Sequence, residues 1–176
     1  KSPVFIEATR VSPFTGRSTD VDVVLDLMIH DLDLVLSVTG DEVSSLSAHG
    51  VCLMTDKLDA VNARIEFAGG SAANISASRI SPRKERSIAI YENDRSISVD
   101  LLQGKSVCIL KEKSGDFSTL EFAAEKIDPV YDELMDFVTS IQQKTSPTVT
   151  GEHGLRALRL ATRIKQYISD NNRVVQ

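Results

Sequence analysis

Seven short strand-like segments follow one another in the middle of the chain, and they constrain its fold more than any other feature. Apolar and polar residues alternate in each, as expected of strands with one buried face. Several joins are short and rich in Gly, Asn and Asp, for example Ala68-Gly69-Gly70-Ser71 and Glu92-Asn93-Asp94-Arg95. This spacing predicts an antiparallel meander. The segments are Val43–Met54, Ala60–Phe67, Ala72–Ile80, Arg86–Tyr91, Ser96–Leu101, Ser106–Lys111 and Ser118–Ala124.

Helices flank the meander. A strand over Val4–Arg10 precedes a first helix over Val23–Val38, which should stop at Gly40. A second helix is expected over Pro129–Lys144, and a third after a Thr150 cap, before the polar tail Ser169–Gln176. We therefore predict a single α+β domain over residues 1–176, with a large, mostly antiparallel open β-sheet and helices packed on one face.

Composition narrows the functional classes. The chain has 176 residues, 41% of them hydrophobic, and a formal net charge of −5, which is ordinary for a globular domain. Its basic residues are scattered, so a nucleic-acid partner is not expected. Neither of the two cysteines, Cys52 and Cys108, sits in a metal-binding spacing. We therefore expect no metal. No apolar run approaches about 20 residues, so we expect no membrane association. The expected location is cytoplasmic.

The first helix carries the most suggestive polar residues. At about 100° per residue, one narrow stripe holds Asp22, Asp26, His30, Asp33 and Ser37, while nearly all other positions are apolar. Asp26 and His30 are four residues apart, so they stack on one face, and a carboxylate that orients an imidazole makes a proton-transfer pair. A purely structural ion pair is the alternative. An acidic strip without Lys or Arg in apolar surroundings favours the functional interpretation.

One strand suggests a surface for association. Ala73, Ile75 and Ala77 alternate with Asn74, Ser76 and Ser78, so both faces carry small side chains that a second sheet could approach. A dimer interface and a simply solvated face are both consistent with this pattern. We expect a homo-oligomer that associates through one of these faces.

The order of the segments resembles the C-terminal domain of Gfo/Idh/MocA oxidoreductases. The resemblance spans nearly the whole chain and rests on the strand Phe5–Arg10, the D-x-x-x-H-x-x-D run from Asp26 to Asp33, the meander and the closing helix around Gly151–Leu158. Ser12-Pro13-Phe14 and Ala73–Arg79 look most like members that oxidise the 3-position of UDP-N-acetylglucosamine. Many members carry glycines before the aspartate, where this chain has Asp20-Val21-Asp22.

The resemblance implies that His30 is the general acid/base for a sugar hydroxyl and that Asp26 orients it or contacts the substrate. We expect Arg10, Asp22 and Asp33 to contact the sugar or nucleotide sugar as well. The family uses NAD or NADP, a lysine from a Glu-Lys-Pro motif and a Rossmann domain, and this sequence has neither that motif nor a G-x-G-x-x-G turn. The chain is thus expected to be the substrate-binding and oligomerisation domain of a longer enzyme, inactive by itself. The alternative is a non-catalytic, sheet-based dimerisation or binding module.

Overall fold

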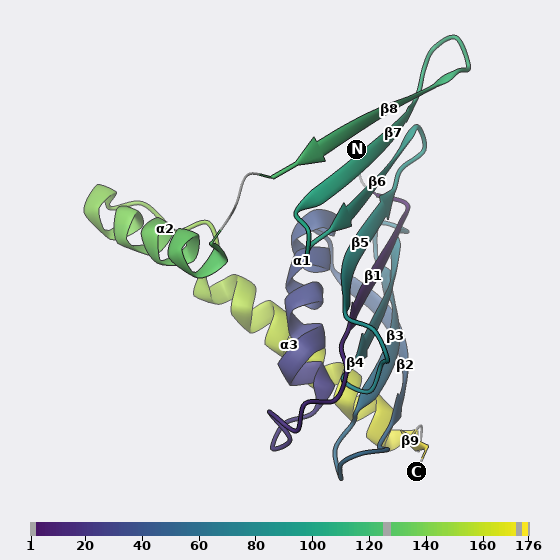
Figure 1. The fold of residues 1–176 in the computed structure, drawn as a ribbon, viewed down its shortest axis with the longest axis vertical. Helices are drawn as coiled ribbons and strands as arrows, with labels where there is room; N and C mark the ends of the chain where they lie inside the picture. The colour runs from purple at the N-terminus through teal and green to yellow at the C-terminus, as the bar shows by residue number, and fades with distance from the viewer. Residues whose placement is uncertain (1–2, 125–127, 172–173, 176) are drawn as a thin grey trace.

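A nine-stranded sheet organises the molecule, with helices on one side of it (Figure 1). The computed structural model describes residues 3–124, 128–171 and 174–175. The strand order is β8-β7-β6-β5-β1-β4-β3-β2-β9. The strands are β1 (Phe5–Val11), β2 (Val43–Val51), β3 (Ala60–Phe67), β4 (Ala72–Ser78), β5 (Glu85–Tyr91), β6 (Arg95–Asp100), β7 (Lys105–Lys111), β8 (Phe117–Ala123) and β9 (Val174–Val175). The predicted α+β class and its mostly antiparallel open sheet are confirmed.

The predicted continuous meander is wrong in one respect, because β1 lies in the middle of the sheet. It pairs in parallel with β4 and antiparallel with β5, so these two strands are not neighbours. Two separate meanders, β2-β3-β4 and β5-β6-β7-β8, are therefore joined through the N-terminal strand. Side-chain alternation identifies which residues share a face, but the choice of neighbouring strand is made by long-range contacts.

Strand β2 ends at Val51 rather than at Met54. The Asp59 carboxylate accepts hydrogen bonds from the backbone N–H groups of Leu53, Met54 and Thr55 at 2.7–2.9 Å. Those groups are therefore committed to a turn and cannot continue a strand.

Helices α1 (Ile29–Thr39) and α3 (Gly151–Asp170) cover one face of the sheet, and a short π-helical turn, η1 (Val24–Met28), leads into α1. Helix α3 packs against α1 and β2. The core lies between these layers and includes the fully buried side chains of Ile6, Met28, Leu32, Ile65, Ile75 and Ile164. Thr150 precedes α3 as predicted, and its backbone N–H donates to His153 Nδ1 at 3.1 Å.

Helix α2 (Pro129–Gln143) does not share this layer. It projects away from the sheet in Figure 1, and its apolar stripe is solvent-exposed, with Val130, Leu134, Phe137 and Ile141 between 56% and 66% accessible. The prediction that helices pack on one face therefore holds for α1 and α3 but not for α2.

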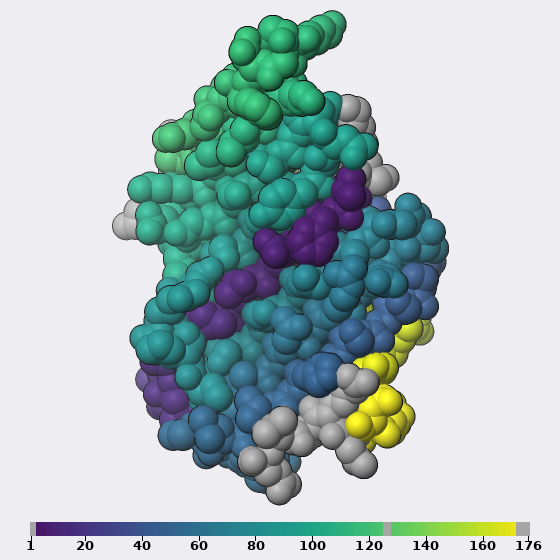
Figure 2. Space-filling view, turned by 90° about the vertical axis from the view of Figure 1, so that its right-hand side faces the viewer, coloured from purple at the N-terminus to yellow at the C-terminus, as the bar shows by residue number. Residues whose placement is uncertain are grey.

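No helix of the described residues lies over the opposite face of the sheet, and Figure 2 shows this face with β1 crossing its middle. Asn74 and Ser76 lie on this open face. Ala73, Ile75 and Ala77, which we also considered as an interface, are at most 1% exposed because they face the helices. That half of the interface prediction is wrong. In the described part of the chain, no helix is both long and apolar enough to cross a membrane.

Candidate functional site

The predicted site residues start at the turn before α1. Asp22 accepts hydrogen bonds from the backbone N–H groups of Val24 and Leu25, both at 3.1 Å, and so satisfies two donors at the start of η1. The helix then runs to Gly40, whose backbone has the left-handed φ of 63° expected of a helix end. The helix was predicted at this place, but its first turn is π-helical. Such turns are rare overall, and many of those that occur lie at functional sites.

The π-helical turn displaces Asp26 relative to the ideal α-helical stripe. Asp26 is half-buried within η1, and His30 is exposed in the first turn of α1. Asp33 is half-buried one turn further along. Within the described residues no hydrogen bond or ion pair joins Asp26 to His30, and Asp33 has no ion-pair partner. Within the described residues these three side chains are therefore not held by one another.

Asp22 has a different environment from the one predicted. Its side chain is 8% exposed, and its Oδ2 forms an ion pair with Lys165 Nζ of α3 at 2.7 Å. The acidic stripe was expected to carry no cation, and Lys165 corrects that expectation. Because this pair ties the start of η1 to α3, it fixes where the first helix begins.

Arg10 on β1 is buried and binds Asp31 of α1 in a bidentate arrangement. Its Nε and Nη2 donate to the two carboxylate oxygens, both at 2.8 Å, and Asp31 is 1% exposed. Asp31 was not among the predicted site residues. A buried carboxylate needs a cation, and Arg10 is the one basic residue of β1. This pair joins α1 to β1 at the residue that follows His30 and so holds the helix against the sheet.

A second buried ion pair holds the loop before the helix, and the sequence did not reveal it. Arg79 Nε donates to Asp59 at 2.9 Å, while its Nη1 donates to the carbonyl of Ser18 at 2.7 Å. The Leu58 carbonyl accepts from Arg79 Nη2 and from the backbone N–H of Val23. The chain segment that enters η1 is thus fixed at both Ser18 and Val23.

Hydrogen bonding sets the charge state of Asp59. Burial alone would raise the pKa of its carboxyl, but donors on Thr55, Leu53 and Met54 outweigh that effect and hold the pKa well below the usual range. Asp59 is therefore an anion at any physiological pH, which suits a permanent partner of Arg79. The sequence shows only that Asp59 follows a polar turn. It could not reveal the role of Asp59 as an acceptor, since most of the donors are backbone groups.

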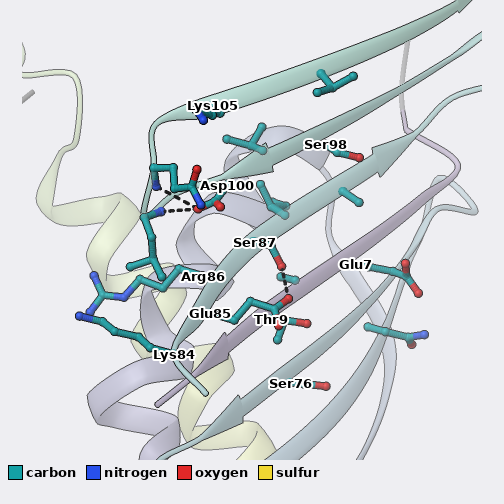
Figure 3. A pocket seen from close by; sticks show the side chains of 18 of the residues that line it. Glu7, Thr9, Ser76, Lys84, Glu85, Arg86, Ser87, Ser98, Asp100 and Lys105 are labelled. Carbon is teal, nitrogen blue, oxygen red and sulfur yellow. Dashed lines mark hydrogen bonds between the residues drawn. The ribbon is translucent and has the colours of Figure 1, made fainter. Parts of the chain in front are cut away.

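A broad hollow of about 790 Å³ lies on the open face. Polar side chains of several strands line it, among them Glu7, Thr9, Ser76, Ser87 and Ser98 (Figure 3). Because α1 packs on the other face, this hollow is separate from His30. Among the described residues, no group of three or more His, Cys, Asp or Glu side chains is arranged to hold a metal ion.

Comparisons with known proteins agree with this architecture. Residues 7–98 match the family described as the GFO/IDH/MocA C-terminal domain. The chain is 35% identical over 170 residues to UDP-N-acetylglucosamine 3-dehydrogenase of Acidithiobacillus ferrooxidans, covering 93% of the chain and 54% of that protein. It is 26% identical to myo-inositol 2-dehydrogenase of Thermotoga maritima, covering 85% of the chain and 48% of that protein. The chain thus spans about half the length of these relatives.

Solved structures extend the comparison. The structure of the Acidithiobacillus ferrooxidans enzyme superposes with a TM-score of 0.88 at 34% identity, covering 94% of this chain and 55% of that one. Levoglucosan dehydrogenase in complex with NADH gives a TM-score of 0.82 at 14% identity, with 96% and 57% coverage. At that identity the second match shows a shared fold only.

Proposed function

The chain belongs to the GFO/IDH/MocA C-terminal domain family, and from this membership we propose that it is the substrate-binding, proton-transferring half of an NAD(P)-dependent sugar dehydrogenase. The oxidised group is a secondary hydroxyl, and the substrate is a nucleotide sugar. The observation that carries the proposal is the exposed His30, which sits on a helix that two buried ion pairs hold in place. The similarity to a UDP-N-acetylglucosamine 3-dehydrogenase supports the choice of substrate.

In this proposal His30 is the general base. Its imidazole accepts the hydroxyl proton as the carbinol becomes a ketone, and it returns the proton in the reverse direction. Asp26, on the preceding π-helical turn, orients the ring or contacts the substrate. Both roles need side chains that are free in the absence of substrate, as these two are in the described structure.

NAD or NADP supplies the hydride acceptor in this chemistry. The sequence has no glycine-rich strand-to-helix turn for its pyrophosphate, so none of this chain's residues is assigned to the cofactor. The chain alone is therefore proposed to be inactive.

The remaining predicted contacts divide by their environment. Asp33 is half-buried on the same helix as His30 and is proposed to bind a sugar hydroxyl. Arg10 and Asp22 were also proposed to contact the sugar. Each already holds an ion pair, so their first contribution is to place the helix beside the substrate.

We further propose that the protein is a cytoplasmic homo-oligomer that associates through the open face. A nine-stranded sheet with helices on one side leaves a wide surface uncovered. That surface includes the stacked rings of Phe5 and Tyr91, whose centroids are 5.9 Å apart. Small polar side chains at Asn74 and Ser76 would let a second sheet approach closely.

A non-catalytic binding module is the second candidate. The observation that favours it is the use of Asp22, just before the first helix, and Asp31, within it, in ion pairs with Lys165 and Arg10. Such a module would need a positioned helix but no proton acceptor. It therefore predicts that His30 can be replaced without loss of function.

Cofactor reduction by the full-length protein distinguishes the two candidates. With a nucleotide sugar as substrate, His30→Ala should lower turnover about 100-fold or more with little change in KM, since the imidazole acts in the transition state. Asp26→Asn should lower turnover in the same direction. Ser37→Ala is the matched control, because Ser37 is exposed on the same helix two turns away. Absence of any cofactor reduction by the wild type would favour the binding module.

A further inference from the structure

Arg86 differs from the other arginines of the sheet. Four arginines lie within strands, namely Arg10, Arg64, Arg86 and Arg95. Three of them pair with carboxylates, at 2.8 Å to Asp31, 3.4 Å to Glu66 and 2.8 Å to Glu92. Arg86 has no carboxylate partner among the residues that the structure describes. Its side chain is exposed.

Arg86 lies next to the buried ion pair that holds the first helix on the sheet. It is directly opposite Arg10 in the antiparallel β1/β5 pair, and directly opposed residues project from the same face of a sheet. Arg10 binds Asp31, the residue after His30. Figure 3 shows the side chains of Lys84 and Arg86 extending together at the margin of the open-face hollow, which both residues also line. A second cation therefore accompanies Arg86.

Neighbouring carboxylates do not neutralise these cations. Glu85 binds Arg83 and Ser87, and Asp100 accepts from the backbone N–H groups of Leu102 and Gln103. An anion that reached Arg86 would thus meet a guanidinium whose two parallel donors suit a phosphate.

A cavity of about 790 Å³ begins at Arg86 and extends along the helix-bearing face toward the edge of the sheet. Val99, Ser106 and Phe122 lie side by side across β6, β7 and β8 in its floor, and Pro129 at the start of α2 also lines it. Phe122 is 59% exposed and offers an aromatic surface. Size and lining are those of a small-molecule site, which combines apolar walls with a few polar groups.

We propose that Arg86 binds the diphosphate of a nucleotide sugar and that the cavity beyond it receives the nucleoside, with the base against Phe122. Neighbouring strands are about 4.8 Å apart, so the floor of the cavity lies roughly 10 to 19 Å from β1 and the Arg10–Asp31 pair. A nucleotide sugar bridges such a span, with its sugar at His30, whereas a free sugar or polyol does not. This assignment rests on the proposed dehydrogenase function and locates the nucleotide part of its proposed substrate.

Binding of UDP to the full-length protein tests the assignment without requiring turnover. By calorimetry in the absence of cofactor, Arg86→Ala should weaken UDP about tenfold to a hundredfold, as expected when a charged hydrogen-bonding partner is lost. Arg86→Lys should give an intermediate value, because it keeps the charge but not the paired donors. The control is Arg83→Ala, which removes an exposed arginine that already pairs with Glu85.

A second variant separates the two parts of the ligand. Phe122→Ala should weaken UDP but leave competition by inorganic pyrophosphate unchanged, since stacking involves only the base. Arg86→Ala should weaken both. An Arg86→Ala variant that binds UDP within twofold of the wild type would overturn the proposal.

Failure of this assignment can be told apart from failure of the proposed function. If the wild type oxidises an unphosphorylated sugar in a His30-dependent reaction but does not bind UDP, the nucleotide site is wrong and the dehydrogenase proposal stands. If UDP binding depends on Arg86 but His30→Ala keeps full turnover, the nucleotide site stands and His30 is not the base.

Discussion

At the scale of single residues, buried ion pairs determine where the exposed residues of the candidate site lie. Asp59 and Arg79 are at most 5% exposed, and together they bind the backbone of Ser18, Leu58 and the turn at Thr55. Removing one member of such a pair leaves the other charged and uncompensated, which costs about 3–5 kcal/mol. The segment that enters η1 depends on this cluster, although none of its members is positioned to contact substrate.

Acid should weaken this cluster in a defined pH range. The pKa of Asp59 in the folded chain lies below its value in the unfolded chain, about 3.9. Its contribution to stability is thus complete above that value and is lost progressively as the pH falls from there toward the lower pKa of the folded chain. Urea unfolding between pH 5 and pH 2 should show a steeper loss for the wild type than for Asp59→Asn, which is less stable at pH 7. Asp56→Asn, an exposed neighbour, is the control, and equal slopes for wild type and Asp59→Asn would contradict the assignment.

At the scale of elements, local patterns predicted most boundaries. Strand β3 was predicted at its observed limits, and the first helix was predicted to stop at Gly40, because alternation and a helix-ending glycine are properties of a few adjacent residues. The π-helical turn could not be predicted, since no residue preference marks it. The exposed apolar stripe of α2 shows a further limit: periodicity identifies the stripe but not its partner.

Gly40 offers a test of the helix end. Its φ of 63° favours glycine, and the space around it is open, so Gly40→Ala should cost about 1 kcal/mol through backbone strain alone. Gly154→Ala is the matched control. Gly154 lies in the first turn of α3 without a positive φ or a close neighbour, and alanine there should stabilise the chain slightly. Chemical denaturation of both variants checks the opposite signs, and a neutral Gly40→Ala would contradict the strain argument.

At the scale of the whole molecule, the two faces of the sheet differ in what covers them. One carries α1, α3 and the candidate site, while the other is open (Figures 1 and 2). Sequence patterns predicted an open sheet but could not tell which set of small side chains was buried, because the answer depends on which side the helices occupy. The central position of β1 was missed for a related reason, since its parallel partner β4 is about 70 residues away in the sequence.

Association through the open face should respond to a charge on it. Ser76→Glu should split the oligomer without unfolding the chain, because it places a carboxylate inside an interface of about 800 Å² per partner. Ser37→Glu, on α1 and therefore on the other side of the sheet, should leave association unchanged. Light scattering over a range of concentrations measures both. A wild-type mass of 19.2 kDa for this chain at all concentrations would contradict the proposed interface.

The central claim is that His30 moves the proton, and chemical rescue tests it most directly. Turnover of full-length His30→Ala should be about 100-fold or more below that of the wild type and should rise with added imidazole, which can enter the space left by the exposed side chain. Imidazole should not stimulate the wild type. Turnover of His30→Ala close to that of the wild type, with no response to imidazole, would contradict the account.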